Sequence, residues 1–273
     1  MNSIYKANLF EGKKILITGG GSGIGLRTAR ELVHLGAKVA IAGRDATKLD
    51  KGLAAIKDDG GEAVPVECNI RDEDSVRDCI TACLEKLGGL DMVVNNAGGQ
   101  FPAPAETIKK KGWHAVVETN LTGTFLVCRE AFTQGMRETG GVIVNIVMNM
   151  WNGLPRMAHS SAARAGVENL TKTLASEWGR RGVRINSVAP GIIESSGLDT
   201  YAPEFQKFVR EASKFNQASR GGTEAETAAA ILFLLSPAAA YITGETLRVD
   251  GGESIFHPYM PPVEHDKLPA WDD

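Results

Sequence analysis

A glycine-rich turn near the start of the chain constrains the fold of this sequence more than any other segment. Residues 18–25 read TGGGSGIG, with an apolar run at 14–17 before them and a helix-like run at 26–33 after them. Glycine lets the backbone turn tightly and approach a ligand closely, and a helix start presents free N–H groups and a positive dipole end. The order strand, turn, helix therefore predicts a diphosphate site, with a purely structural turn as the alternative. The candidate ligand-binding residues of the turn are Gly19, Gly21, Ser22, Gly23, Ile24 and Gly25.

Strand-like runs alternate with helix-like runs along the rest of the chain. The expected strands cover residues 14–18, 38–42, 62–68, 90–95, 141–147, 184–189 and 245–249. The expected helices lie near 23–35, 45–58, 72–87, 106–118, 120–139, 160–181 and 224–236. Because this alternation is typical of parallel strands joined by helices, we predict an α/β fold, with one doubly wound domain spanning residues 1–273 and helices on both faces of about seven parallel strands. Ligands of such sheets bind at the carboxyl ends of the strands.

Composition fits that fold and excludes several classes of partner. The 273 residues are 43% hydrophobic and 23% charged, with a formal net charge of −3. No basic block supports nucleic-acid binding, and no apolar run has the length of a membrane span or forms a signal core. The four cysteines, at positions 68, 79, 83 and 128, lack metal-ligand spacing. We therefore expect reduced thiols, no metal site, no nucleic-acid or membrane partner, and a cytoplasmic location.

The residues after the expected second strand predict which dinucleotide binds. Gly43 stands where an acidic residue would bond the ribose hydroxyls of NAD, and a cation, Arg44, follows it. The planar guanidinium of Arg44 suits a 2′-phosphate, and Lys48 adds a positive charge one helical turn further on. We predict NADP(H) as the cofactor, and the alternative is that both cations are ordinary solvated surface charges.

Two further strand ends carry small residues and amides. Asn69 and Ile70 follow the third strand, and Asn96, Ala97 and Gly98 follow the fourth. Small side chains allow close approach to a flat adenine and its ribose, and asparagine offers both a donor and an acceptor. These five residues are therefore further candidates for cofactor binding, although a plain turn would also explain an Asn-Ala-Gly segment.

Together these motifs resemble the short-chain dehydrogenase/reductase family. The residues that carry the resemblance are the glycine turn, Asn95-Asn96-Ala97-Gly98, Asn120, Asn145 and Pro190-Gly191, in the family's order over about residues 10–252. The resemblance implies a Rossmann fold, a nicotinamide cofactor, and a homodimer or homotetramer. It also implies that the nicotinamide carboxamide is held by Pro190, Gly191, Ile193 and Ser195.

The catalytic positions depart from the family pattern. That pattern comprises an Asn, a Ser, and a Tyr and a Lys four residues apart, and Asn120 keeps the first of these. Met148 stands at the Ser position, Ser160 at the Tyr position and Arg164 at the Lys position. Arg164 suits the nicotinamide ribose but does not exchange protons near neutral pH, and an aliphatic hydroxyl is a far weaker acid than a phenol. The usual acid/base is therefore absent.

The replacement residues favour a different reduction. Asn120, Asn149 and Ser160 are hydrogen-bond donors that could hold a carbonyl oxygen and stabilise developing enolate charge. Reducing a C=C bond conjugated to a thioester requires only that support on oxygen, whereas ketone reduction requires a proton there. His159 is the one nearby side chain that titrates near neutral pH, so it is a candidate proton donor, and the alternative is that it packs the start of its helix.

This variant pattern resembles peroxisomal trans-2-enoyl-CoA reductases and, more distantly, 2,4-dienoyl-CoA reductases. The residues that carry it include CNIR at 68–71, AHS at 158–160 and ARAGV at 163–167. The resemblance implies an NADPH-dependent reductase of an apolar α,β-unsaturated substrate such as an enoyl-CoA thioester. The alternatives are a carbonyl reductase or alcohol dehydrogenase acting on an apolar, terpenoid-like alcohol or aldehyde, and a non-catalytic NADP-binding sensor or scaffold.

Two segments beyond the expected sixth strand complete the prediction. Residues 196–220 carry aromatic side chains at roughly helical spacing, which suggests a lid over an apolar substrate, with a covering helix as the alternative. Tyr201 in this segment is a candidate replacement phenol or a packing residue. The tail at 253–273 is rich in proline yet apolar, so we expect it to lie across a neighbouring subunit.

Overall fold

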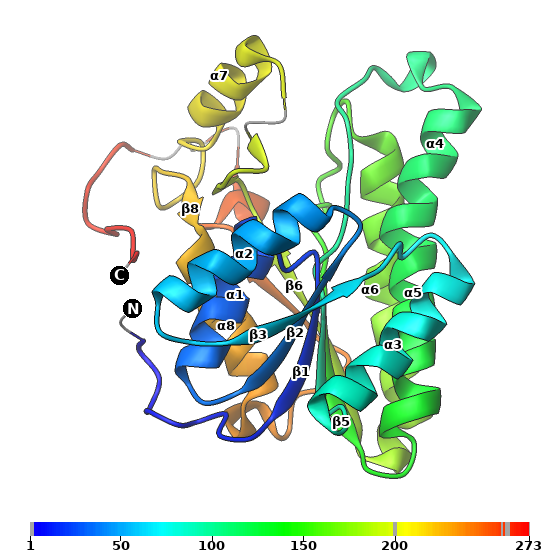
Figure 1. Ribbon diagram of the computed structural model, residues 1–273. Helices are drawn as coiled ribbons and strands as arrows, with labels where there is room; N and C mark the ends of the chain where they lie inside the picture. Colours follow the sequence, from blue (N-terminus) through cyan, green and yellow to red (C-terminus); the bar gives the residue numbers. More distant parts are fainter. Residues whose placement is uncertain (1–2, 199–200, 258, 260–262, 273) are drawn as a thin grey trace.

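A seven-stranded parallel sheet runs through the centre of the molecule (Figure 1). The computed structural model describes residues 3–198, 201–257, 259 and 263–272. The strand order is β3-β2-β1-β4-β5-β6-β9, so the chain starts in the middle and winds outward in both directions. The strands are Lys14–Thr18 (β1), Lys38–Gly43 (β2), Ala63–Glu67 (β3), Met92–Asn95 (β4), Gly141–Ile146 (β5), Val183–Pro190 (β6) and Thr246–Val249 (β9). The predicted doubly wound α/β fold is confirmed, and every predicted strand lies within two residues of its expected bounds.

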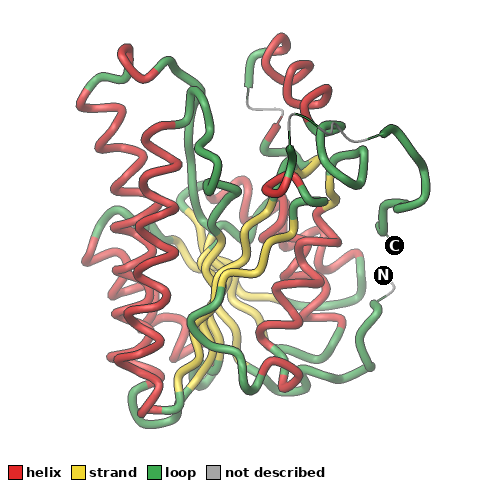
Figure 2. Tube along the Cα trace, turned by 180° about the vertical axis from the view of Figure 1, so that it is seen from behind, coloured by secondary structure: helices red, strands yellow, loops and turns green. Residues whose placement is uncertain are grey.

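Helices cover both faces of this sheet (Figures 1 and 2). One face carries α1 (Gly23–His34), α2 (Ala46–Asp58) and α8 (Glu224–Leu235), and the other carries α3 (Glu73–Leu87), α5 (Gly123–Ala131) and α6 (Ala158–Trp178). In β1, Ile15 and Ile17 belong to the core beneath α1 and α8, whereas Leu16 belongs to the core beneath α3 and α5. Successive strand residues point to opposite faces, so a strand covered on both sides needs apolar residues throughout. None of the helices in the described part of the chain is long and apolar enough to span a membrane.

The segment from α4 (Lys110–Val117) to residue 136 forms one helical rod, where the sequence predicted two helices at 106–118 and 120–139. Two π-helical turns, Glu118–Thr122 and Phe132–Met136, continue the rod on either side of α5. The segment contains no proline, so nothing forces the backbone to leave the helix. The first π-helical turn holds Asn120, and such turns are frequent at functional sites.

A chain of buried polar side chains fixes β4, β5 and β6 against α6. Asn95 donates to Asn145 Oδ1 at 2.8 Å. Asn145 donates to Thr171 Oγ1 at 2.9 Å, and the Thr171 and Ser187 hydroxyl oxygens lie 2.8 Å apart. All of these residues are at most 2% exposed. Because buried polar groups stabilise a fold only when they are paired, this chain of bonds specifies how the four elements align.

The four cysteines are free and buried. Cys128 on α5 accepts an N–H bond from Asn95 at 3.1 Å, and burial raises the pKa of its thiol to about 12. Such a thiol stays protonated and unreactive at neutral pH. Cys128 therefore packs in the core and accepts one hydrogen bond there.

The segment predicted as a lid stands away from the sheet. Its helix α7 (Pro203–Ala212) is the yellow helix at the top of Figure 1. A two-stranded parallel ribbon of β7 (Ile193–Glu194) and β8 (Gly222–Thr223) joins the two ends of the segment. The Tyr201 and Phe205 ring centroids lie 5.3 Å apart, while Phe208 is 62% exposed. The aromatic side chains thus contact one another only in part, and the lid function stays a prediction.

The C-terminal tail returns to its own subunit. The Thr223 hydroxyl donates to the Trp271 carbonyl at 2.7 Å, and Arg220 Nε donates to the Leu268 carbonyl at 2.8 Å. The Arg27 guanidinium on α1 lies 5.8 Å from the centroid of the Trp271 ring. These contacts hold the end of the tail beside α1 and α8, and the expected contact with a neighbouring subunit stays a prediction. The predicted lid and tail residues that fall outside the described residues are Asp199, Thr200, Pro258, Met260, Pro261, Pro262 and Asp273.

Candidate active site

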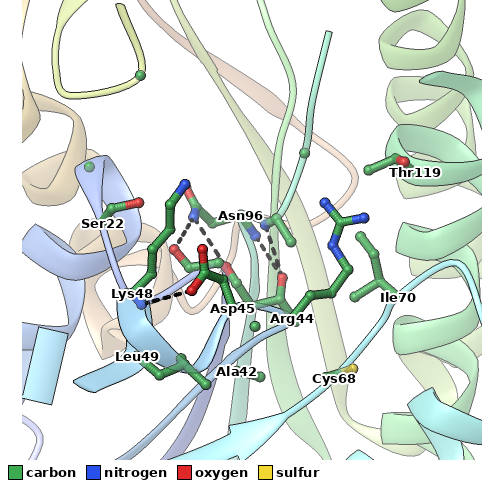
Figure 3. A pocket seen from close by; sticks show the side chains of 18 of the residues that line it. Ser22, Ala42, Arg44, Asp45, Lys48, Leu49, Cys68, Ile70, Asn96 and Thr119 are labelled. Carbon is green, nitrogen blue, oxygen red and sulfur yellow. Dashed lines mark hydrogen bonds between the residues drawn. The ribbon is translucent and has the colours of Figure 1, made fainter. Parts of the chain in front are cut away.

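A cavity of about 330 Å³ opens at the carboxyl ends of β1 to β4 (Figure 3). It starts at the glycine turn after β1, passes the end of β2 and reaches the loop after β4. The predicted cofactor residues that line it are Gly19, Gly21, Ser22, Gly23, Ile24, Arg44, Lys48, Asn69, Ile70, Asn96, Ala97, Gly98 and Ser195. Candidates from separate segments of the sequence thus share one continuous surface.

Some residues that line the cavity were not predicted to bind the cofactor, and some predicted cofactor residues do not line the cavity. Lining residues that were not among the cofactor candidates are Thr18, Ala42, Gly43, Asp45, Leu49, Cys68, Arg71, Thr119, Ser196 and Gly197. Most of them adjoin a predicted residue at a strand end, so the rule for strand ends would have found them. Predicted residues outside the lining are Gly25, Arg164, Pro190, Gly191 and Ile193.

Asn96 links the glycine turn to the end of β4 by hydrogen bonds. Its Nδ2 donates to the carbonyl oxygens of Thr18 at 3.1 Å and of Gly19 at 3.2 Å. A methyl group added at Gly25 would collide with Asn96 Nδ2 and would lie 2.5 Å from the Gly19 carbonyl oxygen. Gly25 therefore acts by letting α1 start directly against the turn, and not by lining the cavity.

The first turn of α1 has the properties of a diphosphate site. Ser22 is the N-cap, its side chain makes no capping hydrogen bond, and the first turn holds no acidic residue. Backbone N–H groups and the positive end of the helix dipole therefore face the cavity, with no carboxylate of the same turn beside them. Ser22, Gly23 and Ile24 all line the cavity, so the residues present fit the diphosphate of a dinucleotide.

The side chains of two cations, Arg44 and Lys48, stand at the end of β2 (Figure 3). Within the described residues neither Arg44 nor Lys48 forms an ion pair, and both are exposed in the cavity. Asp45 lies between them in sequence, but its carboxylate accepts the Lys48 backbone N–H at 3.2 Å as the N-cap of α2. The third cation of the cavity, Arg71, pairs with Glu118 at 2.6 Å. The charges of Arg44 and Lys48 are therefore the ones available to a phosphate.

Arg164, at the usual lysine position, is buried beneath the loop after β4. It is 7% exposed, and its Nη1 donates to the Ile146 carbonyl at 2.5 Å. A methyl group added at Gly98 would collide with Arg164 Nη2 and would lie 2.9 Å from Asn120 Oδ1. Burial lowers the pKa of Arg164 to about 10, which still leaves the guanidinium charged at neutral pH. Arg164 is therefore a fixed positive charge directly behind the cavity residue Gly98.

Asn120 binds the backbone of the same loop. Its Oδ1 accepts the Gly99 N–H at 3.0 Å, and its Nδ2 donates to the Gly99 carbonyl at 2.9 Å. The side chain is wholly buried in the π-helical turn. Asn120 therefore holds the backbone that carries Gly98 and Gln100.

Ser160 and His159 lie wholly buried at the start of α6. The Ser160 hydroxyl donates to Gln100 Oε1 at 2.5 Å. His159 Nδ1 accepts the Ser160 backbone N–H at 2.8 Å, and the His159 ring meets the Phe101 ring edge-on at 4.5 Å between centroids. Burial lowers the pKa of His159, against an opposing contribution from the Phe101 backbone, so the imidazole is neutral at neutral pH. His159 packs the helix start, and its role as a proton donor stays a prediction.

Asn149 is engaged away from Ser160. Its side chain lies beside the Glu253 carboxyl group, and its backbone N–H donates to the Pro190 carbonyl at 3.2 Å. Burial raises the pKa of Glu253, and a methyl group added at Gly191 would lie 2.8 Å from Glu253 Oε2. Asn149, Pro190 and Gly191 therefore pack together around this carboxyl group. The structure does not join Asn149 to Ser160 and Asn120 in one hydrogen-bonding cluster.

Comparison with known proteins finds similarity over most of the chain. A family model described as Enoyl-(Acyl carrier protein) reductase matches residues 19–254. A protein named probable 2,4-dienoyl-CoA reductase from Bacillus subtilis is 36% identical over 252 residues, covering 91% of this chain and 99% of the relative. A 3-oxoacyl-(acyl-carrier-protein) reductase from Synechocystis is 39% identical over 245 residues, covering 88% of this chain and 96% of the relative. The structure of a citronellol catabolism dehydrogenase from Pseudomonas aeruginosa is 47% identical, with a TM-score of 0.84 over 93% of this chain and 100% of that one.

The doubly wound sheet and the cavity beside the glycine turn define a dinucleotide-binding protein with a Rossmann fold. The sequence identities of 36%, 39% and 47% extend over most of this chain and of each relative, so they indicate a shared family as well as a shared fold. The chain belongs to the short-chain dehydrogenase/reductase family, and thus to a family of nicotinamide-dependent oxidoreductases. The names of the relatives cover different substrates, so membership by itself leaves the substrate open.

Replacing Gly98 with alanine should weaken cofactor binding. The new methyl group collides with the Arg164 guanidinium, whereas a methyl group at the neighbouring Gly99 meets nothing within 4 Å. We expect Gly98→Ala to raise the dissociation constant for NADPH by about tenfold or more, the cost of a typical overpacked contact. Fluorescence titration measures this, with Gly99→Ala as the matched control. Equal affinities for the two variants would contradict the prediction.

His159 should make the folded protein lose stability as the pH falls. Folding lowers the His159 pKa from its ordinary value of 6.5, so the neutral imidazole contributes stability above that value and loses it as the pH falls toward the folded pKa. The free energy of unfolding in urea, compared at about pH 7.5 and about pH 5.5, should therefore drop less in His159→Asn than in the wild type. The exposed His114 provides the control variant, His114→Asn, which should keep the wild-type drop. The same drop in all three proteins would refute the assignment.

Proposed function

We propose that this protein is an NADP(H)-dependent reductase of an apolar α,β-unsaturated substrate, such as an enoyl-CoA thioester. The observation that carries the proposal is the wholly buried Ser160 at the usual tyrosine position, one helical turn from the charged Arg164. Neither side chain supplies a proton to a carbonyl oxygen near neutral pH. The family description and the dienoyl-CoA reductase relative support reduction of a C=C bond as well.

The residues of this chain suit stabilisation of an enolate. When bound, the nicotinamide cofactor supplies the hydride that adds to the β-carbon of the substrate. The carbonyl oxygen then carries negative charge and needs a hydrogen-bond donor but no proton, because the carbonyl re-forms when the α-carbon is protonated. Arg164 adds a fixed positive charge in a region that is almost closed to water. His159 in its neutral form is our candidate for the α-carbon proton, directly or through water.

The proposed preference for NADPH rests on the end of β2. Arg44 and Lys48, which form no ion pair among the described residues, present positive charge to the cavity that a 2′-phosphate would neutralise. A methyl group added at Gly43 would make only an ordinary 3.5 Å contact with Leu49, so packing does not exclude a larger side chain there. The missing carboxylate thus removes the group that would bind the NAD ribose and repel a phosphate.

A second candidate function is oxidation or reduction of an apolar alcohol or aldehyde. The 47% identity with the citronellol catabolism dehydrogenase favours it. This chemistry needs a proton donor in place of the usual tyrosine, and Tyr201 of the predicted lid lies 3.4 Å from Gln100 Nε2, which connects it to Ser160. A non-catalytic NADP-binding sensor or scaffold is the remaining alternative. We further propose a homodimer or homotetramer, in keeping with the family resemblance, and a cytoplasmic location, in keeping with thiols that we expect to be reduced.

The three candidates differ in which substrates oxidise NADPH. We expect turnover of trans-2-decenoyl-CoA with a kcat of about 1 s⁻¹ or more and a kcat/KM at least about a hundredfold above that for citronellal or decanal. The decrease in NADPH absorbance measures each rate. Turnover of the carbonyl compounds alone would favour the second candidate function, oxidation or reduction of an apolar alcohol or aldehyde. Tight NADPH binding without turnover across the panel would favour the sensor or scaffold.

Replacing Arg44 with alanine should lower the preference for NADPH. A charge-assisted hydrogen bond to a phosphate is worth about 1.5–3 kcal/mol, so we expect the KM for NADPH to rise roughly ten- to hundredfold. The KM for NADH, which lacks the phosphate, should change less than about twofold. Arg180→Ala removes an exposed cation that does not line the cavity and provides the control. An equal rise in the KM for NADPH and for NADH would show that Arg44 does not bind the 2′-phosphate.

A further inference from the structure

The Ser160 hydroxyl cannot be reached from the cavity directly. Ser160 is 0% exposed, and its hydroxyl donates to Gln100 Oε1 at 2.5 Å and lies 3.5 Å from Met148 Sδ. Gln100, in contrast, is exposed on the loop after β4. A substrate that approaches this position therefore meets the Gln100 amide before it meets Ser160.

The backbone beneath Gln100 is held firmly. Two residues before it, Gly98 packs against Arg164, and the intervening Gly99 gives both of its backbone polar groups to Asn120 at 3.0 and 2.9 Å. Asn120 is itself wholly buried. Gln100 therefore follows a backbone segment that is hydrogen-bonded to Asn120 and packed against the Arg164 guanidinium, although its own side chain is exposed.

The Gln100 amide has a defined orientation, and one of its two Nε2 hydrogens is available to a further acceptor. Its Oε1 is occupied by the Ser160 hydroxyl, which can only donate to an oxygen acceptor there. Its Nε2 therefore faces outward, where it lies 3.4 Å from the Tyr201 hydroxyl oxygen. An amide nitrogen carries two hydrogens, so one remains for a further acceptor after the bond to Tyr201.

We propose that Gln100 donates the hydrogen bond to the carbonyl oxygen of the substrate and that Ser160 is a positioning residue, which orients the Gln100 amide. This inference rests on the proposed reduction of an α,β-unsaturated substrate. In that reaction the bound nicotinamide would supply the hydride that adds to the β-carbon, and the C=C electron pair would move to form the enolate. The α-carbon would then take its proton from His159, directly or through water that returns the proton from solvent, as the carbonyl re-forms. Gln100 keeps both of its amide hydrogens throughout, and its N–H stabilises the enolate oxygen.

This arrangement explains why a serine can occupy the usual tyrosine position. A serine side chain is too short to fill the space of a tyrosine, and the Gln100 side chain reaches across the gap to its hydroxyl. An amide N–H stabilises an oxyanion without transferring a proton to it, so Gln100 suits an enolate and does not suit the formation of an alcohol. The pair Gln100–Ser160 therefore provides the donor that C=C reduction needs without a tyrosine.

A double-mutant cycle tests the division of roles. We expect Gln100→Met, which keeps the length of the side chain but removes the amide, to lower kcat about a hundredfold with trans-2-decenoyl-CoA, the loss typical of an oxyanion donor. Ser160→Ala should cost clearly less, about tenfold, and the double variant should equal Gln100→Met alone. The KM for NADPH should stay within about twofold in all three. Gln134→Met, at a glutamine on the distant end of the helical rod, is the control and should retain full kcat.

Two results of this cycle would overturn the inference. A larger loss in Ser160→Ala than in Gln100→Met would make Ser160 the direct donor. A double variant whose loss is the product of the two single losses would show that the residues act independently.

The pH profile of Gln100→Glu provides a second readout. A carboxylate offers no hydrogen, whereas a protonated glutamic acid donates one from the same place. Activity of Gln100→Glu relative to the wild type should therefore rise as the pH falls from about 7.5 to about 5, while the loss in Gln100→Met should not change with pH. Parallel profiles for the two variants would contradict a donor role for Gln100.

The positioning role is also tested without turnover. In a crystal structure of Ser160→Ala, we expect the Gln100 amide to leave its present position, and an unmoved amide would overturn the positioning role. If the wild type reduces only carbonyl substrates, the proposed function fails, and the same cycle measured on that carbonyl decides the role of Gln100. The substrates that the wild type turns over thus test the proposed function, whereas the double-mutant cycle tests the role of Gln100.

Discussion

The position of the cofactor cavity depends on one side chain, Asn96, which joins the ends of β1 and β4. Its Nδ2 donates to the carbonyl oxygens of Thr18 and Gly19, and the Thr18 hydroxyl accepts the N–H groups of Asn96 at 3.1 Å and Ala97 at 3.0 Å. A turn made mostly of glycine has almost no side chains that could specify its shape, so these bonds supply that shape. Because α1 starts from this turn, the same bonds also aim its first N–H groups at the cavity.

The loop after β4 extends this order to the catalytic region. Gly98 leaves room for the buried guanidinium of Arg164, and Asn120 binds the backbone between Gly98 and Gln100. Arg164 and Ser160, which stand at the usual lysine and tyrosine positions, therefore still contribute to the order of this region. The guanidinium keeps the positive charge, and the short Ser160 side chain donates its hydroxyl hydrogen to Gln100 on the loop after β4.

Much of the fold and part of the site were predictable, for identifiable reasons. Strands such as β1 are covered on both faces, so their apolar runs are unbroken and their bounds can be read to within two residues. The rod at 110–136 was predicted as two helices, because a π-helical turn has no sequence signal comparable to a proline or a glycine cap. Cavity residues next to strand ends followed from the topology of parallel sheets, whereas Thr119, which comes from that π-helical turn, did not.

The sequence by itself determined the sheet, the glycine turn and the identity of the residues at the catalytic positions, since these depend on local periodicity and on motif spacing. Only the tertiary structure decided how those residues are used. It showed that Asn149 lies beside Glu253, that His159 is wholly buried, and that Ser160 donates to Gln100, which lies 60 residues away in sequence. Hydrogen-bond partners of this kind are set by the packing of a loop against a helix, and no local pattern in either segment records which acceptor a buried hydroxyl will meet.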